Sequence, residues 1–436
     1  MLIEFKVSNF RSFKDEQTLS LVAGRDSSHP ESLIPVDDDH LLKTVALYGA
    51  NASGKSNLIR AMMVMRDFVV GSATKMNQGD RIDGISPFRL SEETSGQPSR
   101  FEIMIMVGSS CYEYGFSASD ERVYGEWLYA KPAVGNRRQL FQRTCPPDGG
   151  AAHWDFGVAL RKEGPLLRER TRDNGLVLSR GAELNMPELS TVFLWFRNGL
   201  DLYDMSHPPS GLIRKTADGI KRDETLCKRV SMLLSDSDVG ITGIVPAQEP
   251  MELPEELIGR FSFETWAKVM AKSRAKTAVH TKHRMADTGA DVEFDLERDE
   301  SNGTQRLFAL AGPIFRALDN GTAVVADELE CSMHPLLTRK LIELFQSAEL
   351  NKKGAQLIFA THDVTLMDPQ LLRRDQIWLV EKKSEGASEL FSLYDFKEDA
   401  KDARPRSTEA FLRRYLAGRY GGVPVFGSTL EDLEFE

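Results

Sequence analysis

The sequence has few cysteines, no long apolar run and no excess of positive charge. Its 436 residues include four cysteines, which lie far apart and form no C-x-x-C pair, so neither a disulfide framework nor a zinc site is indicated. No segment approaches the roughly 20 apolar residues that span a bilayer, and the first residues lack the pattern of a signal peptide. We therefore expect a cytoplasmic protein that does not enter a membrane.

The overall charge is acidic. The chain has 55 Lys and Arg residues against 65 Asp and Glu residues, a formal charge of −10, which argues against coating nucleic acid through overall charge. Two local basic stretches, 161–172 and 268–284, could still contact a phosphate backbone. Neither interleaves aromatic residues for stacking, and a solvated helix face or a surface for an acidic partner explains them as well.

Apolar patterning predicts an α/β fold. Alternating residues at 3–7 and 18–21 predict a hairpin that opens the fold, and 101–129 predicts an antiparallel meander. An apolar run at 44–48 followed by helix-forming residues at 57–65 predicts a strand, a loop and a helix. The closing third predicts parallel strands beneath helices. Its strand runs are 322–326, 356–360 and 376–380, with a helix at 336–350.

The strongest motif is a complete G-x-x-x-x-G-K-S at residues 49–56, between the predicted strand and the predicted helix. Glycines there let backbone N–H groups and the helix N-terminus face phosphates. Lys55 would reach the β and γ phosphates and the Ser56 hydroxyl would hold Mg²⁺. The alternative is a glycine-rich turn with a chance lysine. The residues expected to contact ATP are Gly49, Asn51, Ala52, Ser53, Gly54, Lys55, Ser56 and Asn57.

Two acids, Asp327 and Glu328, follow the apolar run at 322–326. This pattern is typical of a Walker B strand, which brings acids to the sheet edge where ligands bind. Asp327 would bind Mg²⁺ through water, and Glu328 would position or deprotonate the attacking water. An ordinary strand end with two solvated acids is the alternative.

Residues 300–305, Glu-Ser-Asn-Gly-Thr-Gln, open a stretch of helical periodicity with Ser301 as a natural N-cap, and Gly312-Pro313 should kink or divide that helix. The segment resembles the signature motif of ABC-type ATPases, with Asn302 in place of the first glycine. The resemblance implies contact with ATP held by a second copy of the chain, and a simple helix cap is the alternative. The residues concerned are Ser301, Asn302, Gly303 and Gln305.

Other positions also resemble ABC-type ATPases. His362, after the run at 356–360, resembles the switch histidine that senses the γ-phosphate, although a lone histidine is often structural. Ser332 lies where the D-loop is expected. Asn185 is the candidate for the glutamine loop, but a role as an ordinary residue at a helix start accounts better for its sequence context. Arg11, in an opening Val7–Phe13 that resembles RecF-like and SMC-like ATPases, would reach the nucleotide phosphates; a surface arginine is the alternative.

Together these motifs resemble the RecF/SMC-like branch of ABC ATPases. Further similarity narrows the resemblance to the AbiL and RloA type of ATPase found in bacterial anti-phage defence operons. That similarity lies at residues 282–283, 375–382, 389–393 and 415–421.

The resemblance implies an ABC-ATPase head, with a mixed sheet flanked by helices and an antiparallel β lobe. Helical patterns near 222–234 and 254–272 predict a helical insertion, so we expect three parts: head residues 1–185, an insertion at 186–284, and head residues 285–436.

The resemblance further implies Mg²⁺-dependent ATP hydrolysis, a homodimer or higher homo-oligomer closed around ATP, and control of an operon-encoded effector, for example a TOPRIM-type nuclease. The alternatives are a RecF-like repair ATPase that binds DNA directly and a scaffold that binds ATP without hydrolysing it.

Overall fold

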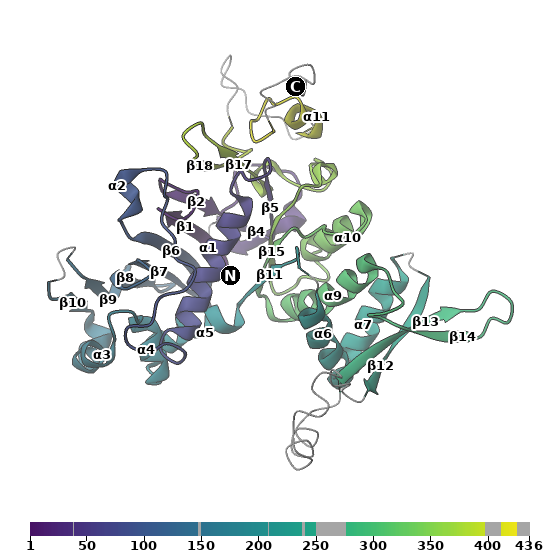
Figure 1. The fold of residues 1–436 in the computed structure, drawn as a ribbon, viewed down its shortest axis with the longest axis horizontal. Coiled ribbons are helices and arrows are strands. Elements are labelled where there is room, and N and C mark those ends of the chain that lie inside the picture. Colours follow the sequence, from purple (N-terminus) through teal and green to yellow (C-terminus); the bar gives the residue numbers. More distant parts are fainter. Residues whose placement is uncertain are drawn as a thin grey trace, which may run out of the picture. The chain divides into compact units, whose positions relative to one another are not determined.

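The structure is a computed structural model of the chain (Figure 1). It describes residues 1–37, 39–146, 150–207, 209–237, 240–249, 276–396 and 411–424. The chain forms two compact units. The first comprises Met1–Asp204, Ala317–Leu329 and Arg339–Glu436, and the second comprises Met205–Arg316 and Glu330–Thr338.

In the described residues of the first unit, seven antiparallel strands form a sheet in the order β10-β9-β8-β7-β6-β1-β2. Its apolar face packs on helix α1, where the Phe116 and Phe68 rings meet edge to face at 5.3 Å. The predicted hairpin and meander are confirmed. The bounds are β1 Leu2–Ser8, β2 Gln17–Ser20, β6 Ser99–Val107, β7 Ser110–Ala118, β8 Val123–Lys131, β9 Arg138–Thr144, β10 His153–Phe156 and α1 Lys55–Gly71.

The first unit also contains a six-stranded sheet in the order β11-β15-β16-β5-β17-β18, counted over the described residues. All neighbours are parallel except β17 and β18. Every residue of β5, β15 and β16 is buried, which explains their unbroken apolar runs and confirms the predicted parallel strands. The bounds are β5 Thr44–Tyr48, β11 Leu200–Asp204, β15 Ala323–Asp327, β16 Gln356–Ala360, β17 Ile377–Lys382 and β18 Ser388–Ser392.

The remaining elements of the first unit are short helices and one hairpin, and α10 begins in the second unit and ends in the first. The helix expected at 336–350 is confirmed as α10. The bounds are β3 Leu33–Val36, β4 Asp39–Leu42, α2 Glu92–Ser95, α3 Gly164–Arg170, α4 Val177–Glu183, α5 Pro187–Asn198, α10 Pro335–Gln346 and α11 Phe411–Leu416.

Helix α4 begins at a buried carboxylate from the seven-stranded antiparallel sheet, which forms the β lobe. The Glu126 side chain, on β8, is fully buried and accepts hydrogen bonds from the backbone N–H groups of Val177 at 2.6 Å and Leu178 at 3.0 Å. These are donors that a helix start leaves unsatisfied. Burial raises the pKa of Glu126 to about 7. Helix α4 in turn meets α1, because the Ser179 hydroxyl donates to the Val69 carbonyl at 2.6 Å.

The second unit combines helices with strands. The helix expected at 222–234 is confirmed as α7, which Asp223 caps; the one expected at 254–272 lies outside the described residues. The stretch expected to be a helical insertion also contains strands. Strand β13 was not predicted because it has only two apolar residues, the adjacent Ala278 and Val279, and its sequence is typical of a charged run. The division at 185 and 284 stays a prediction. The bounds are α6 Ser210–Arg222, α7 Glu224–Ser235, β12 Ile241–Glu249, β13 Lys276–Arg284 and β14 Asp291–Asp295.

Helix α9, Asn302–Asn320, is not divided at Gly312-Pro313, contrary to one of the two expectations for this pair. Proline at 313 cannot donate to the carbonyl of Ala309, four residues earlier. The Thr216 hydroxyl of α6 donates to that carbonyl at 3.0 Å instead. A Cβ at Gly312 would lie 2.3 Å from the same hydroxyl oxygen. Gly312 and Pro313 therefore leave room for α6 to pack closely against α9, and α9 continues as a helix past both residues.

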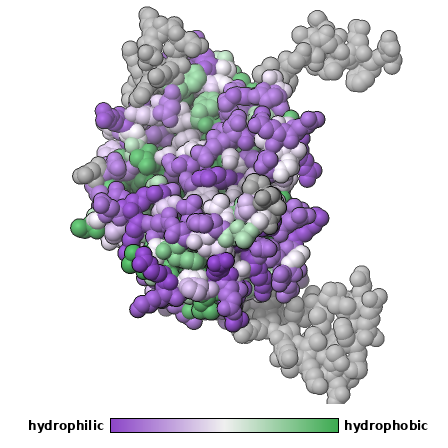
Figure 2. Space-filling model, turned by 90° about the vertical axis from the view of Figure 1, so that its left-hand side faces the viewer, coloured by the Kyte–Doolittle hydropathy of each residue, from purple (hydrophilic) through white to green (hydrophobic). Residues whose placement is uncertain are grey.

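No helix in the described ranges is long and apolar enough to cross a membrane. The face shown in Figure 2 is mostly hydrophilic, with its hydrophobic residues in small separate groups.

Candidate nucleotide site

Three motifs meet at one edge of the six-stranded sheet. Strands β15, β16 and β5 are parallel neighbours, with Ala326 opposite Phe359 and Ala360 opposite Leu47. Their carboxyl ends therefore lie side by side, so the loop after β5, the acids at the end of β15 and the polar residues after β16 share that edge. This is where open α/β sheets bind ligands.

The phosphate-binding loop, or P-loop, is the G-x-x-x-x-G-K-S motif at residues 49–56. It follows β5 and leads into α1, and glycine is required at two of its positions. Gly49 has a φ of 155°, and a Cβ there would lie 2.3 Å from the Val380 carbonyl oxygen of β17. Gly54 has a φ of 122°, and a Cβ there would lie 2.6 Å from the Ser388 hydroxyl oxygen of β18. The loop thus passes so close to the neighbouring strands that a side chain does not fit.

The side chains of the P-loop are largely buried. Lys55 is 6% exposed, and its ammonium donates to the carbonyls of Gly49 at 2.7 Å and Ala50 at 3.2 Å. These contacts hold a positive charge over the loop at the N-terminus of α1, where anions are favoured. Asn51 and Ala52 are exposed, and Ala52 has a left-handed φ of 61°.

Asp327 lies beside Ser56, as a shared metal site requires. The Ser56 hydroxyl is hydrogen-bonded to the Asp327 carboxylate, and the other oxygen, Oδ1, is buried with no hydrogen-bond partner among the described residues. Burial, with repulsion from Asp204 and Glu328, raises the pKa of Asp327. A buried, unsatisfied carboxylate oxygen next to a hydroxyl fits Mg²⁺, which prefers oxygen ligands and keeps several waters. A cluster of three His, Cys, Asp or Glu ligands is absent from the described residues, and a P-loop site does not need one.

Glu328 and His362 follow their strands on the same edge. Glu328 is half-buried and has a left-handed φ of 54°, which is unusual outside glycine and directs its side chain differently from that of Asp327. His362 is exposed, two residues after the end of β16. Both are therefore open to a ligand at this edge. Their catalytic roles stay predictions.

The first hairpin also contacts the P-loop. The Ser12 hydroxyl accepts from the Asn57 side chain at 2.9 Å, and Ser12 would also lie 3.0 Å from a Cβ at Gly54. Arg11, with a left-handed φ of 52°, precedes this serine. Burial and the nearby charges of Arg60 and Arg89 lower the pKa of Arg11. An arginine whose neighbours are positive is suited to an anionic ligand.

Arg11 lies at a cavity beside the loop 84–90. Its backbone N–H donates to the Ser86 carbonyl at 2.8 Å, which fixes the hairpin turn to the loop 84–90. Arg11 and Arg89 line a cavity of about 470 Å³ between these segments. The charge of Arg60 also lies near Asp327.

The signature segment belongs to the second unit. The Ser301 hydroxyl accepts from the Thr304 N–H at 3.2 Å, which confirms the predicted N-cap. The Gln305 side chain donates to the carbonyls of Glu297 and Glu300, and the signature turn is thereby closed. A Cβ at Gly303 would lie 2.8 Å from the carbonyl of Ser332, the D-loop candidate, which has a left-handed φ of 58°. Ser301 and Asn302 are exposed.

Sequence reasoning missed Asp204. This acid ends β11 and lies opposite Asp327 in the parallel register, where its charge raises the pKa of Asp327. Asn185, the candidate for the glutamine loop, lies in the turn between α4 and α5, and its role stays a prediction. The alternating Leu200–Asp204 was a strand signal, but it fell in the stretch expected to be helical.

The basic stretch 268–284 is described only from residue 276. There, Lys282 lies opposite Glu293 and Arg284 lies opposite Asp291 in the register of β13 and β14. Opposite charges directly across strands attract each other, which reduces the positive field of this sheet. In the stretch 161–172, Arg161 and Arg168 are exposed, and a nucleic-acid contact there stays a prediction.

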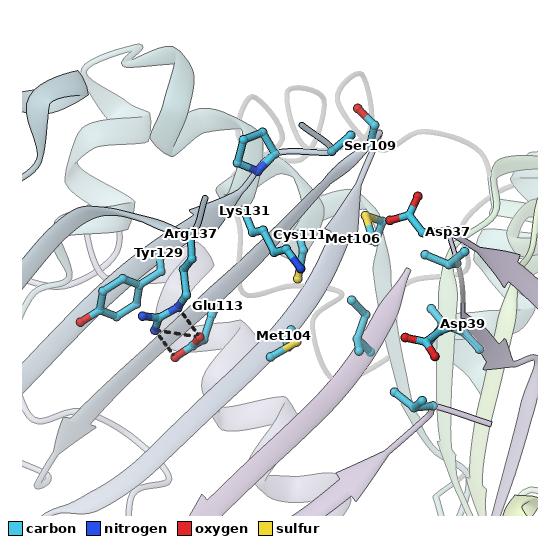
Figure 3. A pocket seen from close by; sticks show the side chains of 16 residues that line it. Asp37, Asp39, Met104, Met106, Ser109, Cys111, Glu113, Tyr129, Lys131 and Arg137 are labelled. Atoms are coloured by element: carbon cyan, nitrogen blue, oxygen red, sulfur yellow. Dashed lines mark hydrogen bonds and ion pairs between the residues drawn. The ribbon is translucent and has the colours of Figure 1, made fainter. Parts of the chain in front are cut away.

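Figure 3 shows another cavity, of about 430 Å³, on the seven-stranded sheet. Met104 and Met106 line it from β6, Asp37 and Asp39 from the β3–β4 hairpin, and Lys131 from β8. None of the P-loop or strand-end residues described above lines it, so this cavity is not the nucleotide site.

A P-loop on a parallel sheet, an acid-ended strand in the same sheet and an antiparallel β lobe define an ABC-type P-loop ATPase fold, and the expected fold class is confirmed. A family model described as "AAA domain, putative AbiEii toxin, Type IV TA system" matches residues 45–368, and the chain belongs to this family.

Solved structures of SMC heads and of the recombination mediator protein RecF are similar to this chain. The SMC head bound to the C-winged helix domain of ScpA is 14% identical with a TM-score of 0.44, over 90% of this chain and 97% of that chain. The SMC head domain from Thermotoga maritima is 13% identical with a TM-score of 0.39, over 90% and 98%. RecF with ATP is 14% identical with a TM-score of 0.29, over 83% and 93%. A comparison with curated proteins finds no match.

Proposed function

We propose that the chain binds and hydrolyses Mg²⁺-ATP, and that two copies close around ATP to control a partner effector. The observation that carries the catalytic part is the buried Asp327, with one oxygen unsatisfied and the other beside Ser56, the residue that follows the P-loop lysine. A buried carboxylate oxygen without a hydrogen-bond partner costs free energy, and a bound divalent cation removes that cost.

Each residue has a chemical task in this proposal. Asp327 and Ser56 would hold Mg²⁺, which, when bound, neutralises charge on the β and γ phosphates. Lys55 and the backbone N–H groups of the loop bind those phosphates. Glu328 positions the attacking water and accepts its proton, while His362 contacts the γ-phosphate. Arg11 adds positive charge from the hairpin.

A second copy completes the site in this proposal. The exposed Ser301 stands at the N-terminus of α9, where the partial positive charge of the helix favours an anion. An ATP bound at the P-loop of one copy would contact the signature segment of the other. The assembly is therefore a homodimer, or a higher homo-oligomer built from such pairs.

Two variants test the catalytic proposal. We expect Lys55→Ala to weaken ATP binding at least about tenfold, because it removes a charge-assisted contact. We expect Glu328→Gln to bind ATP normally and to release phosphate about 10²- to 10⁴-fold more slowly, as for loss of a general base. Calorimetry and a steady-state phosphate assay measure these. Glu343→Gln, on the exposed side of α10, is the matched control.

The outcomes separate the alternatives. Turnover by Glu328→Gln at the wild-type rate would contradict its role. A wild-type chain that binds ATP and pairs without releasing phosphate would be a scaffold. Salt-dependent DNA affinity that falls when the basic residues of 268–284 are neutralised would favour the RecF-like alternative.

The role in anti-phage defence is part of the same proposal. Support comes from the family description, which names a toxin of a type IV toxin–antitoxin system, and from the AbiL- and RloA-like motifs of the sequence. The effector would be the product of a neighbouring gene, for example a TOPRIM-type nuclease. Copurification of that product with this chain, followed by a nuclease assay with and without ATP, tests the proposal. Nuclease activity that is the same with and without the chain, and with and without ATP, would contradict it.

A further inference from the structure

A buried carboxylate joins the three-stranded sheet to the signature segment. Glu300, directly before Ser301, has a side chain that is only 8% exposed. Its Oε1 accepts two hydrogen bonds from β13: one from the Thr281 hydroxyl at 2.5 Å and one from Nε2 of His283 at 2.7 Å. Thr281 is fully buried.

The signature turn depends on Glu300 through its backbone as well. The Glu300 carbonyl accepts from the Gln305 side chain at 3.0 Å, and the next residue, Ser301, caps α9. The Glu300 side chain thus fixes the direction from which the chain enters α9. Since Ser301 is exposed while the Glu300 side chain is buried, the buried side chain orients the exposed residue.

We propose that His283 is a positioning residue for ATP hydrolysis: through Glu300 it holds Ser301 in the orientation that contacts ATP in the second copy. This inference rests on the proposed function. His283 is also in ring contact with Phe294, at 4.6 Å between centroids, so its hydrogen bond and its packing are separable by mutation.

Two substitutions at this position separate the two roles. His283→Phe keeps a ring on Phe294 and removes the donor, whereas His283→Gln keeps an N–H at a similar reach and removes the ring. We expect His283→Phe to lower kcat about tenfold, because a donor to a buried carboxylate is lost and the serine that it orients is displaced. His283→Gln should retain most of the turnover. ATP affinity of the single chain should be unchanged in both, since the P-loop belongs to the first unit.

The control is His280→Phe. His280 lies on the same strand but pairs with Glu293 at 3.2 Å, and this variant should turn over ATP as the wild type does. A second readout is ATP-dependent pairing in the Glu328→Gln background, followed by sedimentation. His283→Phe should weaken pairing several-fold and His283→Gln should not.

The results distinguish this inference from the proposed function. If the wild type hydrolyses ATP and His283→Phe matches it in kcat and in pairing, the positioning role is refuted. The same holds if His283→Gln is as impaired as His283→Phe, or if only ATP affinity changes. If the wild type neither hydrolyses ATP nor pairs with it, the proposed function fails and this inference fails with it.

Discussion

Glu126 makes a measurable prediction about folding and pH. Burial raises its pKa from 4.5 to about 7. Hydrogen bonds from two backbone N–H groups of α4 and from the Tyr114 hydroxyl at 3.1 Å favour the ionised form and oppose this rise in pKa. Between these values the folded chain binds the proton more strongly than the unfolded chain. The contribution of this group to stability is therefore fully present below about pH 4.5 and is lost as the pH rises through about 7. A pKa rise of this size corresponds to about 3 kcal/mol.

The assay compares the wild type with Glu126→Gln. The free energy of unfolding in urea, followed by tryptophan fluorescence, is measured at several pH values from 5 to 8. The wild type should lose stability relative to the variant as the pH rises, because the amide cannot titrate. The variant should also lose about 1–3 kcal/mol at pH 5, since its amide N–H₂ group faces a backbone donor of α4.

The control for this measurement is Glu113→Gln. Glu113 lies on the adjacent strand β7, and its partly exposed carboxylate pairs with Arg137 at 2.9 Å. This variant should keep the wild-type pH dependence. A difference between wild type and Glu126→Gln that stays constant from pH 5 to 8, or that grows in favour of the wild type, would refute the reasoning.

Two further predictions concern the nucleotide site. Asp204→Asn should raise the Mg²⁺ concentration needed for ATP binding about tenfold, because a negative charge beside Asp327 is lost; a Mg²⁺ titration identical to that of the control Asp201→Asn would contradict it. Gly49→Ala should lower the free energy of unfolding by about 1–3 kcal/mol more than Gly79→Ala, because only the former places a Cβ against a backbone oxygen. If urea unfolding shows that both variants lose the same free energy of unfolding, the positive φ alone sets the cost and the contact with the backbone oxygen adds nothing.

The sequence alone sufficed where the signal is local. The P-loop is a run of consecutive residues with fixed roles, and its context, an apolar strand followed by a helix, lies within residues 44–71. The positions of Asp327 and His362 were predictable for a similar reason, since each follows an unbroken apolar run that marks a buried strand.

Residues that act through distant partners were not predictable. Asp204 matters because β11 pairs with β15, a contact set by the sheet and not by the local pattern. Glu126 caps a helix that begins at residue 177, and Thr216 satisfies a carbonyl that a proline on another helix leaves without its helical donor. Each of these is a polar side chain whose partner is brought close only by tertiary packing.

The position of β5 has a consequence for how the chain folds. This strand is hydrogen-bonded to β16 on one side and to β17 on the other, and both are made long after it. The buried Gln356 amide also donates to the carbonyls of Leu2 and Leu42. The β lobe has all its strands within the first 156 residues and can form early during synthesis. The P-loop reaches its final shape only after the last third of the chain, which contains β16 and β17, has been made. A fragment that ends before β16 therefore contains the complete motif but lacks the sheet that gives the motif its shape.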